Sequence, residues 1–417
     1  MPFNRRNFLG KTAGLGALAA SGSISLFSQD RRDVSYYLDQ AASRPVLDLT
    51  GLNDPVIIES VDLLRRGNQH YVRVRSKDGV EGISLDNGRA AYVAPIFLQR
   101  VAPFFIGKDA RQLENHLWEL YRWRSNYKLQ GLAFWSPVAW MEFAILDLLG
   151  RVADRSIGDL LGGVIRKQVP FYVASGQRDS TPEEEIDYLR GLIEETGAKA
   201  IKYRVGGRMS RNEDALPGRT PKLIELSRKE LGDEMAIHAD SNSSYDPPQA
   251  IEVGRMLEDI GAVYFEEPCP FDHLEDTRQV TDTLRIPVAG GEQEYSQWRF
   301  KWAIENRAVD IVQPDLHYYG GLIRSIRVSR MAELLNMPTT VHISGGFGFV
   351  YMLHFASRTP DIGDWQEYKR NIENYADWFD PPLRIEDGSI TVPEGPGVGI
   401  VDTKRVLEGS GLIESVS

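Results

Sequence analysis

The sequence predicts an α/β protein whose larger part is a closed (β/α)8 barrel of parallel strands. From residue 169 onward, short runs rich in β-favouring residues alternate with polar–apolar stretches of helical length. There are eight such runs, and no Gly-rich phosphate-binding fingerprint follows the first, which makes an open doubly wound sheet the weaker alternative. The runs are residues 169–175, 200–205, 234–242, 262–268, 286–292, 310–315, 338–344 and 362–368.

The residues before the barrel predict a smaller N-terminal domain of mixed α and β structure. Short strand-like runs occupy residues 46–90, with a turn signal at residues 77–79. Residues 93–125 and 136–151 carry apolar residues at helical spacing, and Ser136 is the candidate N-cap of the second helix.

The two ends of the chain have different expected roles. The C-terminal tail contains the turn-rich segment PEGPGVGIVD, which we expect to be β structure packed on the N-terminal domain. Residues 1–30 combine Arg5-Arg6 with a weakly apolar run of small residues, a pattern typical of a twin-arginine export signal. A basic tail or membrane anchor is the alternative. We expect a mature protein that begins near residues 29–45, has no stable membrane span, and lies in the periplasm or another extracytoplasmic space.

Composition excludes some partners. The chain has 417 residues and a formal net charge of −11, so it lacks the basic surface that nucleic acid binding requires. A small anionic substrate remains compatible with this charge, because a local cation inverts the field of a pocket. A single cysteine, Cys269, rules out an intrachain disulfide.

Three carboxylates predict a metal site. Asp240, Glu266 and Glu292 end the third, fourth and fifth barrel runs, and successive members are 26 residues apart. One βα unit has about that length, so the three side chains are expected at the same height on the barrel face where active sites lie. Oxygen ligands of this kind suit a hard divalent cation, Mg2+ first. One acid alone would be more simply explained as a helix cap or surface charge. The next residue, Glu267, is expected to point elsewhere, into a salt bridge.

Two further pairs of residues follow the same strand logic. Asp315 ends the sixth run and His342 lies in the seventh, 27 residues later, so a carboxylate is expected to orient an imidazole base. A hydrogen-bonded core histidine is the alternative. Lys202 and Arg204 are two residues apart on the second run and therefore share one strand face, directed into the barrel mouth.

Two residues are weaker candidates for substrate contacts. Glu367 ends the eighth run, where a structural salt bridge is the alternative role. Asn242 lies beside the predicted metal site, where it either contacts substrate or holds a loop turn.

Taken together, these motifs resemble those of the enolase superfamily, in particular its mandelate racemase-like group, which includes acid-sugar dehydratases. The resemblance rests on the SPVAWMEFAILDLLGR helix with the following LLGG, on KYR, DSN, FEEP, GGE and QPD, on the seventh-strand histidine, and on GPGVG. It implies a modified TIM barrel, (β/α)7β, over residues 166–375. It also implies an α+β capping domain, residues 46–165, completed by the C-terminal segment, residues 376–417.

The resemblance also implies a chemistry. One Mg2+ per subunit would be held by Asp240, Glu266 and Glu292, and a base would remove the proton α to a substrate carboxylate. Loops of the capping domain near residues 60–70 and 84–92 would choose the substrate, with Asn87, Arg89 and Tyr92 as candidates. A homo-oligomer is expected.

One departure from the family pattern favours a particular reaction. The racemase-like pattern carries Lys-x-Lys on the second strand, whereas this chain has Arg204 at the second position, and a guanidinium is a poor base. Elimination of water needs only one acid–base group, so we expect His342 to act alone in a sugar acid dehydratase that forms a 2-keto-3-deoxy acid. Arg204 would then bind the carboxylate or the leaving hydroxyl. The alternatives are a racemase or epimerase that uses Lys202 with His342, and an exported binding protein without catalysis.

Overall fold

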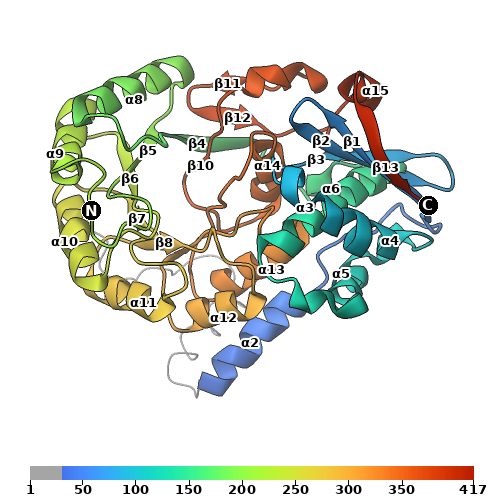
Figure 1. The fold of residues 1–417 in the computed structure, drawn as a ribbon, viewed down its shortest axis with the longest axis horizontal. Coiled ribbons are helices and arrows are strands. Elements are labelled where there is room, and N and C mark those ends of the chain that lie inside the picture. Colours follow the sequence, from blue (N-terminus) through green and yellow to red (C-terminus); the bar gives the residue numbers. More distant parts are fainter. Residues whose placement is uncertain (1–30) are drawn as a thin grey trace, which may run out of the picture.

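The computed structural model describes residues 31–417 (Figure 1). The expected export signal, residues 1–30, lies outside the described residues. The export and the extracytoplasmic location therefore stay predictions, which secretion of a reporter fused to this segment would test.

The N-terminal domain is built on a four-stranded antiparallel sheet in the order β13-β1-β2-β3. Its strands are β1 (Ile58–Arg66), β2 (Gln69–Ser76), β3 (Glu81–Leu85) and β13 (Gly411–Val416). Val416 at the end of the chain pairs with Val61 in β1, so the C-terminal segment completes the sheet as expected. The expected β segment at residues 393–402 is instead a loop, and the strand lies further along the chain.

The single helix expected over residues 93–125 is wrong, because the segment is broken into short pieces. Pro95 and Pro103 lack the backbone donor that a continuous helix needs, and Gly107 adopts a positive φ of 75°. The pieces are α3 (Ala90–Ile96), a π turn η3 (Phe97–Val101), α4 (Ala102–Phe105), η4 (Ala110–Gln112), α5 (Leu113–Arg122) and η5 (Trp123–Lys128).

Helix α6 (Leu132–Ala153) is the core helix of the capping domain and packs against β3. It begins at Leu132 with Gly131 as its N-cap, so Ser136 lies buried inside the helix and is not the cap. A Cβ on Gly82 would lie 2.3 Å from backbone atoms of α6, so a glycine is required at this contact. Among the described residues, α6 is the one helix long and apolar enough to span a membrane, and 89% of its apolar window is buried inside the fold.

Helix α2 (Arg31–Ser43) was not expected from the sequence. It packs along α12 (Gln297–Glu305) and α13 (Leu322–Glu333), with Leu38 buried and Asp39 paired to Lys301 at 2.6 Å. The folded chain thus includes residues that the sequence analysis placed before the first domain.

The barrel contains the eight predicted runs in order. Six are parallel neighbours: β4 (Gln168–Ala174), β5 (Ala200–Arg204), β6 (Ala236–Asp240), β7 (Tyr264–Glu266), β8 (Val288–Gly290) and β9 (Ile311–Val312). The seventh run forms only single bridges, Val312–Thr339 on one side and Thr339–Ile362 on the other. The eighth, β10 (Gln366–Glu367), pairs with β4 and closes the barrel.

Seven helices follow the first seven strands and surround the barrel (Figure 1). Besides α12 and α13, they are α8 (Pro182–Thr196), α9 (Arg219–Leu231), α10 (Pro247–Asp259), α11 (Leu274–Thr283) and α14 (Gly348–Arg358). After β10 the chain instead forms the short 3-10 turns η6 (Ile372–Asn374) and η7 (Ala376–Trp378), the hairpin β11 (Ile385–Glu386) and β12 (Ser389–Thr391), and α15 (Thr403–Leu407). The architecture is therefore the (β/α)7β form, with β12 added to the outer edge of β4.

Glu142 of α6 joins the capping domain to the barrel. Its Oε1 accepts a hydrogen bond from the Ile323 amide at 3.1 Å, at the start of α13. Gly321, with φ of 112°, lies so close that a Cβ there would be 2.2 Å from the same oxygen. Because α13 follows the loop that carries Asp315, this contact holds one edge of the barrel mouth against α6.

The buried Glu142 makes the stability of the fold depend on pH. Burial raises the pKa of Glu142 from 4.5 to about 8, so the folded chain binds this proton more tightly than the unfolded chain does. The free energy of unfolding therefore falls as pH rises from about 4.5 to about 8. Glu142→Gln removes this cost and is expected to be more stable than wild type by about 5 kcal/mol at pH 8.5, with little difference at pH 4.

Urea unfolding at several pH values measures this difference, and Glu225→Gln, an exposed position on α9, is the control. If wild type instead gains stability over Glu142→Gln as pH rises, the ionised carboxylate is favourable at this place and the interpretation is wrong.

Candidate active site

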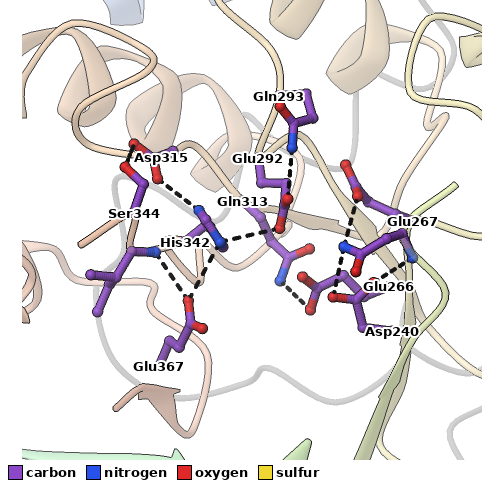
Figure 2. A network of polar contacts seen from close by, with 12 residues as sticks. Asp240, Glu266, Glu267, Glu292, Gln293, Gln313, Asp315, His342, Ser344 and Glu367 are labelled. Carbon is purple, nitrogen blue, oxygen red and sulfur yellow. Dashed lines mark hydrogen bonds and ion pairs between the residues drawn. The ribbon is translucent and has the colours of Figure 1, made fainter. Parts of the chain in front are cut away.

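Three carboxylates lie side by side at the carboxyl ends of neighbouring strands. Strand pairing places Asp240 of β6 opposite Glu266 of β7, and Glu292 follows β8 by two residues. One oxygen from each lies within 4.8 Å of the others, and all three side chains are buried. Figure 2 shows this group on one side of His342, with Asp315 on the other. The structure thus places these three side chains together, as their repeated spacing of 26 residues predicted.

Two cations from β5 offset part of this negative charge. Lys202 Nζ donates hydrogen bonds to both carboxylate oxygens of Glu266, at 3.0 and 2.8 Å. The Arg204 guanidinium contacts the carboxylate of Asp240. Both side chains point to the same side of the strand, as their separation predicted, and both are buried. Three carboxylates and two cations leave a formal charge of −1 in a group of buried side chains.

The donor set fits a hard divalent cation. All three candidate ligands are carboxylate oxygens, the chemistry that Mg2+, Ca2+ and Mn2+ prefer. Oε2 of Glu292 is buried and accepts no hydrogen bond within residues 31–417. Neighbouring amides orient the group, because Gln313 Nε2 donates to Glu266 at 3.1 Å and Gln293 Nε2 donates to Glu292 at 2.8 Å. A bound cation would relieve the repulsion among these carboxylates.

His342 and Asp315 form the expected pair. Nδ1 of His342 lies 2.7 Å from Oδ2 of Asp315, and the two residues are also bridge partners between neighbouring strand ends. The other oxygen of Asp315 accepts from the backbone amides of His317 and Tyr318, both at 2.7 Å, and from Ser344 Oγ at 3.0 Å. The carboxylate is therefore held rigidly and in turn fixes the plane of the imidazole.

The second ring nitrogen of His342 faces the metal site. Nε2 lies 3.4 Å from Glu292 and 4.0 Å from Glu367. Burial alone would lower the pKa of His342, but these two carboxylates outweigh it. With the hydrogen bond to Asp315 added, the pKa of His342 is raised. The nitrogen that can move a proton thus points to the place where a substrate beside the carboxylates would lie.

Lys202 is not arranged as a free amine. Burial acts to lower its pKa, but the charges of Glu266 and Glu367 overcome this and raise the pKa of Lys202 above its ordinary value. The ammonium group is held by two hydrogen bonds to one carboxylate. This geometry gives Lys202 the role of a counter-charge rather than of a second base.

The prediction for Glu267 is wrong. Its backbone adopts φ of 43°, which breaks the alternation of the strand and turns the side chain back toward the site. Glu267 is buried without an ion pair among the described residues, and Asn242 Nδ2 lies 3.5 Å from its Oε2. Burial, together with the nearby charges of Glu292 and Glu266, raises the pKa of Glu267 well above its ordinary value. The protonated form of Glu267 is therefore favoured by its surroundings more than that of an exposed glutamate.

The two weaker candidates are engaged within the protein. Asn242 donates from Nδ2 to Asp240 at 3.1 Å and accepts from Arg178 at 2.8 Å, so both ends of its amide are used. Glu367 pairs with Lys369 at 2.9 Å and accepts from the Ile343 amide at 3.0 Å. Both lie beside the proposed reacting groups, and their roles as substrate contacts stay predictions.

The capping-domain loop reaches the acid–base pair. Asn87 Nδ2 donates to Ser344 Oγ at 3.1 Å, and Ser344 in turn donates to Asp315. Arg89 donates to the Tyr318 hydroxyl at 2.6 Å. The third candidate of this loop, Tyr92, is 58% exposed. Two of the three loop candidates are thus connected to the residues around His342.

Sequence reasoning gave no site role to four polar residues that the structure places here: Arg178, Gln313, Ser344 and Lys369. Gln313 lies two residues from Asp315 in the same run, and Lys369 lies two residues from Glu367, just after the eighth run, so strand alternation is the signal that could have found them. The same alternation could have found Ser344, which lies two residues after His342. Arg178 lies in a loop, where no periodic signal exists.

Asp315→Asn tests the orienting role. An amide at this position can hold the ring but cannot stabilise the protonated imidazole, so kcat is expected to fall by about 10²- to 10³-fold with a smaller change in KM. Steady-state kinetics with the natural acid measures this split. Asp361→Asn, a carboxylate beyond the end of α14, is the control. Equal loss of kcat from both variants would contradict the assignment.

The fold and the buried oxygen-ligand site define a metal-dependent enzyme of the enolase class. A family described as Enolase C-terminal domain-like matches residues 185–404, and Mandelate racemase / muconate lactonizing enzyme, N-terminal domain, matches residues 55–162. The chain therefore belongs to the mandelate racemase/muconate lactonizing enzyme family of the enolase superfamily.

Individual relatives refine this placement. The chain is 29% identical over 346 residues to an arabinonate dehydratase of Saccharolobus solfataricus, covering 80% of this chain and 88% of the relative. A solved structure of a putative racemase from Roseobacter denitrificans is 33% identical, with a TM-score of 0.79, and covers 87% of this chain and 100% of that one. A mandelate racemase/muconate lactonizing protein from Paracoccus denitrificans PD1222, solved with magnesium, is 25% identical with a TM-score of 0.77, covering 86% and 99%.

Proposed function

We propose that this protein is a Mg2+-dependent sugar acid dehydratase, which removes water from an acid to form a 2-keto-3-deoxy acid. The observation that carries the proposal is the asymmetry of the acid–base groups. One proton-transfer nitrogen, Nε2 of His342, faces the carboxylate site, and the β5 side holds an ion-paired Lys202 and the permanently charged Arg204. β-Elimination needs one such group, whereas racemisation needs one on each face of the substrate.

Asp240, Glu266 and Glu292 would hold the cation. When bound, Mg2+ supplies positive charge that stabilises the negative charge developing on the substrate carboxylate. The structure solved with magnesium, 25% identical to this chain, supports Mg2+ over the other hard cations. Lys202 and Arg204 add further positive charge at the carboxylate end.

His342 performs both proton transfers. Neutral Nε2 takes the proton from the carbon next to the carboxylate, and Asp315 stabilises the imidazolium that results. The imidazolium then gives this proton to the β-hydroxyl as the carbon–oxygen bond breaks, so water leaves and the histidine is neutral again. The remaining enol becomes the 2-keto acid when its hydroxyl releases a proton and the β-carbon takes one up. No net redox change occurs.

The arabinonate dehydratase relative supports the same reaction class. The alternative is a racemase or epimerase, which the 33% identity to a putative racemase favours. The two differ in the fate of the α-carbon. A dehydratase converts it to a carbonyl, and an epimerase returns a proton to it.

A substrate screen in D2O separates these outcomes. Mature protein with Mg2+ is incubated with aldonic and aldaric acids of several configurations, and 2-keto acid and deuterium at the α-carbon are measured. Keto acid from a subset of acids is the expected result. Deuterium at the α-carbon of recovered acid, without keto acid from any member, would instead favour the epimerase.

A further inference from the structure

The proposed function leaves one cation of the site without an anionic partner. Arg178 lies in the loop after β4, where Nε donates to the Gly206 carbonyl at 3.1 Å and a terminal nitrogen donates to Asn242 Oδ1 at 2.8 Å. Both acceptors are neutral, and no acidic side chain within residues 31–417 forms an ion pair with it. Buried and half-buried charges are normally compensated, so this exception requires an explanation.

Arg178 lies next to the metal site rather than on a remote surface. Asn242, which accepts from Arg178, donates from its other end to Asp240 at 3.1 Å. One side chain therefore separates the guanidinium from a proposed metal ligand. A ligand that contacts the metal site and extends by a few atoms would reach Arg178.

The surroundings of Arg178 are positive. Burial, together with the charges of Arg204, Arg208 and Arg219, lowers the pKa of Arg178 to about 9. Arg204 contacts Asp240 and Arg219 lies 3.6 Å from Glu185, so these two have acidic neighbours. Arg178 and the exposed Arg208 do not. With a pKa of about 9, Arg178 stays charged near neutral pH, and with the neighbouring Arg208 it concentrates positive potential at this side of the barrel mouth.

A count of formal charge over the three carboxylates and the two cations of β5 leaves Arg178 and Arg208 uncompensated when a monoacid binds. The three carboxylates with Lys202 and Arg204 sum to −1, and a divalent cation changes the sum to +1. The carboxylate of a sugar monoacid then makes the inner site neutral. The positive charges of Arg178 and Arg208 are not included in this sum.

The loop that carries Arg208 is held in a strained shape against the site. Met209 and Asn212 have positive φ of 49° and 77°, and so do Asn242 and Ser243, at 42° and 64°. The Met209 amide donates to the Asn242 carbonyl at 3.0 Å, which ties the two strained loops together. Backbone strain of this kind persists where the surrounding structure holds a functional arrangement in place.

We propose that Arg178, together with Arg208, forms a subsite for a second anionic group at the far end of the substrate, so that the preferred acid is a sugar diacid. The inference rests on the proposed function, since it assumes that a first carboxylate lies at the metal site. The required chemistry is a second anion, and a phosphate ester on a sugar monoacid would supply it as well. The test distinguishes these two sources.

The experiment is calorimetric titration of the Mg2+-loaded mature chain carrying His342→Asn, so that ligands are bound without turnover. The probes are hexonates, the hexarates of the same configurations (gluco, galacto and manno), and 6-phosphogluconate. At least one hexarate is expected to bind about tenfold to hundredfold more tightly than its hexonate, which is the range for a charge-assisted hydrogen-bonded pair. Tighter binding of 6-phosphogluconate than of any hexarate would overturn the diacid and assign the subsite to phosphate.

Substitutions at the two arginines test whether they cause the preference for the diacid. Arg178→Gln is expected to remove the preference for the diacid while changing hexonate affinity less than about threefold, and Arg178→Lys to retain part of it. Arg208→Gln is expected to have a smaller effect in the same direction. Arg278→Gln on α11, an exposed arginine paired with Asp282, is the matched control, and thermal melts verify that each variant folds.

Two results would overturn the proposal. One is that no hexarate or phosphate in the panel binds more tightly than its hexonate, including the case in which none of them binds. The other is an equal loss of affinity for hexonate and hexarate in Arg178→Gln. If the proposed function is wrong, no acid in the activity screen gives keto acid. The affinities for hexonates and hexarates can still be compared in that case.

Discussion

Replacement of His342 by Asn is expected to lower 2-keto acid formation by about 10⁴-fold, the largest loss from any single acid–base residue. Nε2 of His342 is the nitrogen that faces the carboxylate site, at 3.4 Å from Glu292, and the proposed route uses it for both proton transfers. Asn can donate a hydrogen bond to Asp315 but cannot move a proton. Affinity for the substrate should change little, because the substrate carboxylate is held by the opposite side of the site.

The measurement is keto acid release by purified wild type and His342→Asn on the acid that the screen identifies. His273→Asn is the matched control, since that imidazole is 62% exposed and pairs with Asp276 rather than with a residue of the site. Keto acid formation within tenfold of wild type would remove His342 from the mechanism.

Replacement of Glu266 by Gln is expected to abolish both metal-dependent stabilisation and activity. Wild type should gain about 2.7 kcal/mol of unfolding free energy when Mg2+ is present at 100 times its dissociation constant, because the folded chain alone holds the three oxygens together. Glu266→Gln should gain none at the same concentration, and its activity should fall by about 10³-fold or more.

The neighbouring residue provides a matched control. Glu267 is also buried and lies next to Glu266, but the structure gives it a raised pKa and places it outside the group of three. Glu267→Gln mimics the protonated side chain and should keep the stabilisation by Mg2+. Thermal unfolding with Mg2+ and with a chelator measures both variants. The ligand assignment is wrong if Glu267→Gln loses the metal effect and Glu266→Gln retains it.

Most of the site could be predicted because it lies on regular structure. Asp240, Glu266 and Glu292 each end a strand of one repeating unit, so equal spacing in the sequence became equal height in the barrel. The same reasoning placed Asp315 beside His342 and put Lys202 and Arg204 on one face. The predicted (β/α)7β barrel and the C-terminal strand that completes the capping sheet also agree with the structure.

The predictions that were wrong concern places where the local sequence pattern does not decide the structure. Glu267 was assigned by strand alternation, which fails at the positive φ where the strand ends. The long helix expected from the apolar pattern of residues 93–125 is interrupted by two prolines. Helix α2 was missed because its position depends on packing against α12 and α13, which lie far along the chain.

The sequence alone therefore determined the fold class, the reacting side chains and their order around the barrel, because these follow from the period of the βα unit and from residue chemistry. Only the tertiary structure decided the pairings. It pairs Lys202 with Glu266, raises the pKa of Glu267 by burying it among carboxylates, and brings Arg178 to the site with no acidic partner among residues 31–417. Charge compensation depends on distances between segments far apart in the chain, and no local pattern in a sequence encodes those distances.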